Sequence, residues 1–239
     1  MGADGRMIRM DNYYIERLNS ASLFRVYDTQ LNRISQYLQA EIEFVRNRLT
    51  GKETILELGA GYGRIMKALA PFCRCITGID ISEQSVALAK EYLSGYDNCE
   101  MICMDAHSIE LDVKYDVVLC LQNGLSALKG GEAANIVAQA VRLLNNGGTA
   151  YFSSYSAKFW HHRLEWFKEQ AEKGLIGEID PDKTKDGNIV CQDGFTARTI
   201  TEEEFASLGR ATGFDYSVIE HDDSILFLVV RNRHAKESG

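Results

Sequence analysis

The sequence predicts an α/β fold built on a mostly parallel seven-stranded sheet, with helices on both faces and the last strand antiparallel. From Thr54 onward, short apolar runs alternate with amphipathic segments, which is typical of βαβ units. The first of these runs ends in closely spaced glycines, as expected at a tight strand-to-helix turn. Near the carboxyl end, the apolar runs Tyr216–Glu220 and Ile225–Val230 are separated by His221–Ser224, which indicates an antiparallel pair.

The remaining elements follow from the same patterns. Apolar residues at helical spacing between Leu23 and Leu49 predict helices before the sheet. Ser82 is a favourable N-cap residue, and Thr201 with Glu204 forms a predicted capping box for a late helix. The predicted strands are Thr54–Leu58, Cys75–Ile79, Glu100–Met104, Tyr115–Leu121 and Thr149–Ser153, and the helices between them are Arg64–Leu69, Ser82–Leu93 and Glu132–Leu144.

We therefore divide the chain into a helical cover over residues 1–50 and a sheet domain over residues 51–239. Residues 155–198 break the alternation of strands and helices and are interpreted as an insertion. Within it, Asp193-Gly194 between Asn188–Gln192 and Phe195–Thr199 indicates a short hairpin.

Composition restricts the possible functions. The net charge of −8 argues against nucleic acid as a partner, because nucleic-acid-binding surfaces are normally basic. The absence of long apolar stretches and of a signal-peptide pattern predicts a cytoplasmic protein without a membrane segment. The six cysteines lack paired CxxC spacing, so neither disulfides nor a structural zinc site is expected.

The most informative segment is the glycine-rich turn that follows Ile55–Leu58. Glycines allow a ligand to approach the backbone without meeting Cβ atoms. The spacing is G-x-G-x-G, which differs from the G-x-G-x-x-G of dinucleotide-binding turns, and no P-loop Lys-Ser/Thr pair follows. The turn therefore predicts a nucleotide-like ligand that need not carry phosphates.

These residues resemble the class I S-adenosylmethionine-dependent methyltransferases, which share a Rossmann-like fold and the motif E/D-x-G-x-G-x-G at this turn. The resemblance extends to carboxylates that end the second and third strands and to Leu143–Gly148, which is similar to the L-x-P-G-G turn of the family with Asn in place of Pro. It implies S-adenosyl-L-methionine as cofactor, with Asp80 binding the ribose and Asp105 the adenine. The implied cofactor-binding residues are Glu57, Gly59, Ala60, Gly61, Gly63, Asp80, Ile81, Asp105, Ala106 and Leu121.

Each of these features also has a simpler interpretation. The glycines alone are compatible with any tight turn between a strand and a helix. Asp80 could cap the helix that begins near Ser82, and Asp105 could be a solvated loop charge. The functional interpretation is favoured because both carboxylates follow predicted strands at the carboxyl edge of the sheet, where open α/β sheets bind their ligands.

Candidate acceptor-facing residues lie outside the glycine turn. Gln122 and Asn123 offer amides that could orient the acceptor or the cofactor, although Asn-Gly is equally a common turn pair. Family resemblance makes the insertion a substrate lid, which would carry His161, and folds an N-terminal segment with Tyr14 over the cofactor. A surface position for His161 and a packing role for Tyr14 are the alternatives. No metal site is expected.

The function predicted from the sequence is transfer of a methyl group to a small-molecule acceptor, by a monomer or homodimer. Methyl transfer from a sulfonium is an in-line displacement in which positioning dominates. The alternatives are a protein methyltransferase, a non-catalytic cofactor-binding module and, less favoured, a nicotinamide-dependent oxidoreductase that uses the glycine turn and Asp80.

Overall fold

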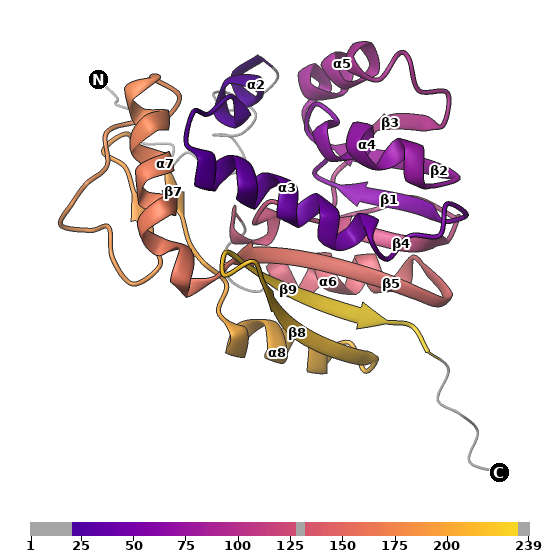
Figure 1. Cartoon of the computed structure of the whole chain (residues 1–239). Helices are drawn as coiled ribbons and strands as arrows, with labels where there is room; N and C mark the ends of the chain where they lie inside the picture. The colour runs from indigo at the N-terminus through magenta and orange to yellow at the C-terminus, as the bar shows by residue number, and fades with distance from the viewer. Residues whose placement is uncertain (1–20, 128–131, 234–239) are drawn as a thin grey trace, which may run out of the picture.

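The computed structural model describes residues 21–127 and 132–233, and it confirms the predicted fold class (Figure 1). The sheet has the strand order β3-β2-β1-β4-β5-β9-β8. The five strands β1 to β5 pair in parallel with their neighbours in this order, whereas β9 is antiparallel to both β5 and β8. The strand bounds are β1 Thr54–Leu58, β2 Cys75–Asp80, β3 Cys99–Cys103, β4 Tyr115–Cys120, β5 Leu144–Tyr155, β8 Asp215–His221 and β9 Ile225–Arg231.

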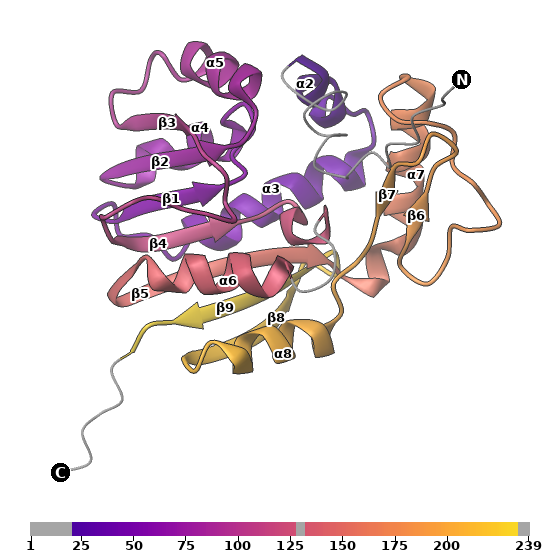
Figure 2. The same cartoon turned by 180° about the vertical axis from the view of Figure 1, so that it is seen from behind.

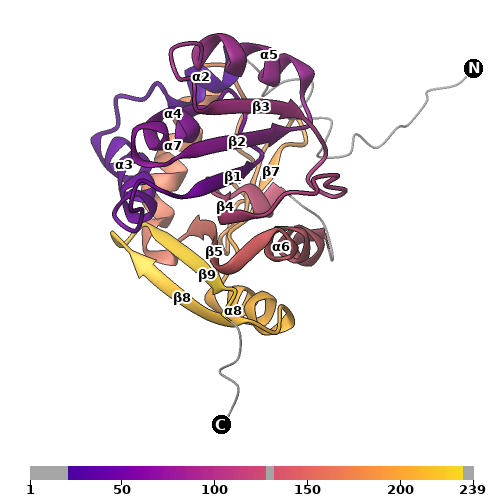
Figure 3. The same ribbon diagram turned by 90° about the vertical axis from the view of Figure 1, so that its right-hand side faces the viewer.

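Helices cover both faces of this sheet because alternate strand residues bury apolar side chains on opposite sides. On one face lie α3 (Asn32–Arg46), α4 (Arg64–Leu69) and α5 (Glu83–Tyr92), packed in one apolar cluster. On the other lie α6 (Glu132–Arg142) and α8 (Glu202–Ala211), packed in a second cluster. Figures 2 and 3 show the two layers of helices with the sheet between them.

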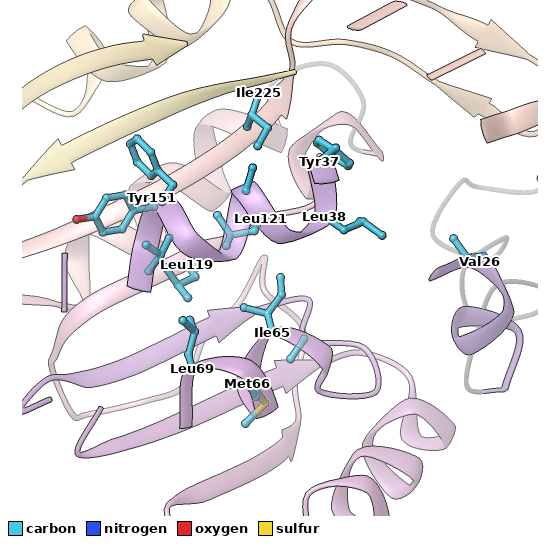
Figure 4. Packing of buried hydrophobic residues seen from close by; sticks show 14 of the residues in the cluster. Val26, Tyr37, Leu38, Ile65, Met66, Leu69, Leu119, Leu121, Tyr151 and Ile225 are labelled. Atoms are coloured by element: carbon cyan, nitrogen blue, oxygen red, sulfur yellow. The ribbon is translucent and has the colours of Figure 1, made fainter. Parts of the chain in front are cut away.

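The cluster beneath α3 fixes the position of this helix over the middle of the sheet. Leu38 of α3, Leu119 of β4, Leu121 just after β4 and Ile65 of α4 belong to this cluster, and Figure 4 labels them. Burial of side chains of this size contributes about 1.5–3 kcal/mol each. Helix α3 is therefore part of the sheet domain's core.

Two further segments lie beyond the carboxyl ends of the parallel strands (Figure 1). The first is α2 (Ala21–Tyr27), and the second comprises α7 (Trp160–Glu172) with the small hairpin of β6 (Ile189–Val190) and β7 (Thr196–Ala197). Single 3₁₀ turns are found at Ala70–Phe72, Gly124–Ala127 and Ala157–Phe159. The indole N–H of Trp166 in α7 donates to the Val26 carbonyl of α2 (3.2 Å), so these segments contact each other.

Some element boundaries differ from those predicted. The hairpin strands are shorter because nearby backbone groups bond outside the β6–β7 ladder, for example the Val190 N–H to the Thr184 hydroxyl (3.0 Å). Strand β5 starts at Leu144, before the predicted Thr149, because Gly147 and Gly148 exchange backbone hydrogen bonds with Asn232 after β9. Among the described residues, no helix is long and apolar enough to cross a membrane.

Candidate cofactor site

A cleft with a volume of about 300 Å³ opens at the carboxyl edge of the parallel strands. Open α/β sheets bind ligands at this edge, where the strand order reverses between β1 and β4. Most of the cofactor-binding residues predicted from the sequence line this cleft, and Gly63 does not. The residues that do are Glu57, Gly59, Ala60, Gly61, Asp80, Ile81, Asp105, Ala106 and Leu121.

The glycine turn serves both the cleft and the packing behind it. Gly59 has a φ of +69° and nothing within 4 Å of an added Cβ, so glycine is required there by backbone conformation. Gly63 has a φ of +86°, and an added Cβ would lie 2.8 Å from Cδ1 of Leu93. The motif therefore combines a turn exposed to the cleft with a close contact between α4 and the end of α5.

Asp80 is a structural anchor of the turn as well as a cleft residue. Its Oδ2 accepts from the Gly61 N–H and its Oδ1 from the Ser82 N–H, both at 2.9 Å. Ser82 itself caps α5, because its hydroxyl accepts from the Ser85 N–H (3.2 Å). The interpretation of Asp80 as the cap is thus not supported. Burial raises the pKa of Asp80, while the two N–H donors oppose this effect.

Asp105 lines the cleft and its side chain is about half exposed. Its Oδ1 accepts from the backbone N–H of His107 (2.8 Å) and contacts His107 Nδ1 (2.9 Å). These contacts lower the pKa of Asp105 against the effect of its partial burial. His107 was not predicted from the sequence as a site residue, although it directly follows Asp105 and Ala106.

A buried carboxyl group and a guanidinium, each with one atom that makes no hydrogen bond within the described part of the chain, also line the cleft. Among the described residues, Oε2 of the buried Glu57 and Nη2 of Arg64 make no hydrogen bond. Burial raises the pKa of Glu57 to about 8, with Arg64 acting in the opposite direction and Glu41 and Asp80 adding to the increase. Arg64 was missed by the sequence analysis although it directly follows the glycine motif.

Comparison with known proteins identifies the domain that holds this cleft. Residues 55–148 match the family described as methyltransferase domain, and this range includes the lining residues from Glu57 to Asn123. Residues 55–148 of the chain therefore correspond to a methyltransferase domain. The chain is similar to the ubiquinone biosynthesis O-methyltransferase of Hydrogenovibrio crunogenus, with 25% identity over 139 residues that make up 56% of each chain. The chain thus spans about half the length of the curated relatives it matches.

Solved structures of similar length share the fold of this chain. N-methyltransferase NodS from Bradyrhizobium japonicum WM9, in complex with S-adenosyl-L-homocysteine, has a TM-score of 0.60 at 16% identity, covering 94% of this chain and 98% of that chain. DhpI in a complex with SAM and HEP has a TM-score of 0.65 at 20% identity, covering 97% and 100%. At these identities the likeness establishes the fold.

The turn after β4 in this methyltransferase domain carries the two predicted amide residues. Both Gln122 and Asn123 line the cleft, but their side chains are engaged inside the protein. The Gln122 amide donates to Glu41, and the Asn123 amide donates to the Arg198 carbonyl (3.0 Å) and accepts from the Ser154 hydroxyl (2.7 Å). Their side chains shape the wall of the cleft.

The other two predicted acceptor-facing residues are not in the described cleft. His161 is exposed on α7 and does not line it. Tyr14 lies outside the described residues. The aromatic residues that the structure does place beside the cleft are Tyr27 of α2 and Tyr62 of the glycine turn. Phe24 stacks on Tyr62 with ring centroids 4.0 Å apart, which holds α2 against the turn.

The described residues of the chain contain no group of three or more His, Cys, Asp or Glu side chains that could hold a metal ion. The six cysteines among them are free thiols. Cys120 lines the cleft from β4, and burial raises its pKa to about 12, so its thiol stays protonated and weakly nucleophilic.

Proposed function

We propose that the protein binds S-adenosyl-L-methionine in this cleft and transfers its methyl group to a small-molecule acceptor. The observation that carries the proposal is that the matched family domain supplies the lining of one cleft from Glu57 to Asn123. S-adenosyl-L-methionine supplies an electrophilic methyl group on a sulfonium. The residues of this chain bind the cofactor, orient it toward the acceptor and exclude water from the cleft.

The charges along the cleft are complementary to the parts of this cofactor. Asp80 can accept hydrogen bonds from ribose hydroxyls, because each of its oxygens keeps a lone pair beyond the bond to Gly61 or Ser82. Asp105, which also lines the cleft, can accept from an exocyclic amine. Oε2 of Glu57 and Nη2 of Arg64, which make no hydrogen bond among the described residues, can accept from the ammonium and donate to the carboxylate of an amino acid.

A small-molecule acceptor is supported by charge, by enclosure and by relatives. The acidic protein has little attraction for nucleic acid. Leu23 and Tyr27 of α2 line one side of the cleft. This enclosure favours an acceptor small enough to fit entirely inside the cleft. The relatives named as O-methyltransferases of ubiquinone biosynthesis point to the same class. We propose α2 and the 155–198 segment as the cover that excludes water during transfer.

Titration calorimetry with S-adenosyl-L-homocysteine tests the cofactor assignment. We expect saturable binding, and we expect none with NADH. A folded protein that shows no heat with the homocysteine compound at millimolar concentration would refute the proposal. Incubation of a cell extract with tritiated S-adenosyl-L-methionine then separates acceptor classes, because label in the protein fraction in place of the small-molecule fraction would indicate a protein methyltransferase.

A further inference from the structure

A carboxylate from outside the matched domain reaches the wall of the cleft. Glu41 of α3 has 0% exposure, and a buried carboxylate is costly unless it is hydrogen-bonded. Its Oε1 accepts from the backbone N–H of Gln122 (2.9 Å) and from the Ser153 hydroxyl (2.5 Å). Its Oε2 accepts from the side-chain amide of Gln122 and lies 3.9 Å from Nη2 of Arg64.

The residue that Glu41 holds has an unfavourable backbone conformation. Gln122 and Asn123 have φ angles of 55° and 58°, in the left-handed region. Asn tolerates this region because its short side chain bonds locally, whereas a residue such as Gln is found there rarely. Strained backbone of this kind persists where surrounding contacts hold it, and such sites cluster around ligands.

The two residues of this turn are held from opposite directions. Asn123 is bonded to Ser154 of β5 and to the Arg198 carbonyl before α8. Gln122 is bonded to Glu41 through both its backbone and its side chain. The turn forms a wall of the cleft through Leu121 to Gly124, so a relaxed Gln122 would change the shape of the binding site.

We propose that Glu41 is a positioning residue, which holds the turn after β4 in its strained conformation and so keeps the cleft shaped for its cofactor. This rests on the proposed function for the identity of the ligand. Through Glu41, helix α3 contributes directly to the shape of the binding site. Oε2 of the same carboxylate lies 3.9 Å from Nη2 of Arg64, so α3 also places a negative charge beside this cleft residue.

Two substitutions separate the hydrogen bonds of Glu41 from its charge. In Glu41→Gln the amide oxygen still accepts from the Gln122 N–H and Ser153, and its NH₂ group faces a Gln122 amide that can rotate to present its own oxygen. In Glu41→Leu the side chain has similar size and no acceptor. Glu43→Gln, on the more exposed side of the same helix, is the matched control.

The experiment measures hydrogen exchange at the Gln122 amide and the dissociation constant of S-adenosyl-L-homocysteine in the full chain. We expect Glu41→Leu to speed exchange at Gln122 while the amides of β4 keep their protection. We expect its affinity to fall about tenfold or more, the scale of losing a buried hydrogen bond to a charged group. Glu41→Gln should stay within about threefold of wild type, and Glu43→Gln should be unchanged.

The possible failures are distinguishable. If wild-type protein does not bind the homocysteine compound, the proposed function fails, whereas faster exchange at Gln122 in Glu41→Leu would still support the anchoring. If wild type binds and folded Glu41→Leu shows unchanged exchange and affinity, the positioning role is overturned. A Glu41→Gln variant as impaired as Glu41→Leu would also overturn it, because the conservative replacement should restore the anchor.

Discussion

At the scale of single residues, Asp80 links the glycine turn to the proposed ligand. We expect Asp80→Ala to weaken binding of S-adenosyl-L-homocysteine by roughly 1–3 kcal/mol, because hydrogen bonds to a partly buried carboxylate are lost. Calorimetric titration measures this. Glu91→Ala, at an exposed position of the neighbouring helix α5, should leave the affinity unchanged. Equal affinity for wild type and Asp80→Ala would remove Asp80 from the site.

Glu57 gives the protein a pH dependence with a definite sign. Burial raises its pKa from 4.5 to about 8 in the folded protein. Between these values the unfolded chain has lost the proton and the folded protein keeps it, so the free energy of unfolding falls as pH rises. Glutamine at this position does not titrate. Urea denaturation should therefore show that the free energy of unfolding of Glu57→Gln rises relative to that of wild type between about pH 5 and about pH 8. The difference should grow by up to roughly 1.4 kcal/mol per pH unit. Parallel pH curves for the two proteins would contradict this.

Some site residues could be predicted from a local sequence pattern, whereas others are brought to the site only by the fold. Asp80 and Asp105 follow apolar strands, and a parallel sheet places such positions at one edge. Glu41 was missed because an acid within a helix is normally solvated. Its spacing gave a usable signal, since it lies on the buried stripe of α3 with Ile34, Leu38 and Val45. Its partner Gln122 is distant in sequence and became visible only with the fold.

At the scale of elements, the capping box of α8 was predicted from sequence and is confirmed. The Thr201 hydroxyl accepts from the Glu204 N–H (3.2 Å), and Oε2 of Glu204 accepts from the Thr201 N–H (2.8 Å). We expect Thr201→Ala to lower the free energy of unfolding by about 1 kcal/mol, because N-terminal N–H groups lose their acceptor. Urea denaturation gives the value.

Ser207→Ala is the matched control for this helix. Ser207 is exposed in the interior of α8, where alanine has the higher helix propensity, so the change should be neutral or slightly stabilising. If both alanine variants have the same stability, the cap contributes nothing measurable.

Strand prediction succeeded where local pattern and long-range pairing agree. The sheet strands were placed to within one or two residues at most ends, because buried parallel strands are continuous apolar runs bounded by turns. The early start of β5 and the short β6 and β7 depend on Asn232 and Thr184, which lie outside the predicted strands. Such boundaries are decided by tertiary hydrogen bonds that a local pattern does not contain.

At the scale of the whole molecule, Arg163 joins α7 to the segment that returns toward the sheet. Its side chain is fully buried and donates to the Gly187 carbonyl (2.8 Å), the Thr199 hydroxyl (2.7 Å) and the Ala197 carbonyl (2.8 Å). The guanidinium also lies 4.4 Å from the centroid of the Tyr155 ring. One planar fork thus connects α7, the hairpin and the end of β5 into one body.

We expect Arg163→Lys to destabilise the protein by about 2–4 kcal/mol, although it keeps the positive charge. The lysine ammonium is a single nitrogen on a shorter side chain, so it cannot donate to all three acceptors that the planar guanidinium contacts. The buried carbonyl groups then lose their hydrogen-bond donors. Urea denaturation measures the loss, and limited proteolysis should cut faster between residues 173 and 188. Arg210→Lys, exposed on α8, should change stability by less than about 0.5 kcal/mol. Were both lysine variants equally stable, charge alone would account for the attachment of α7, and the three hydrogen bonds would not be needed to hold this segment beside the cleft.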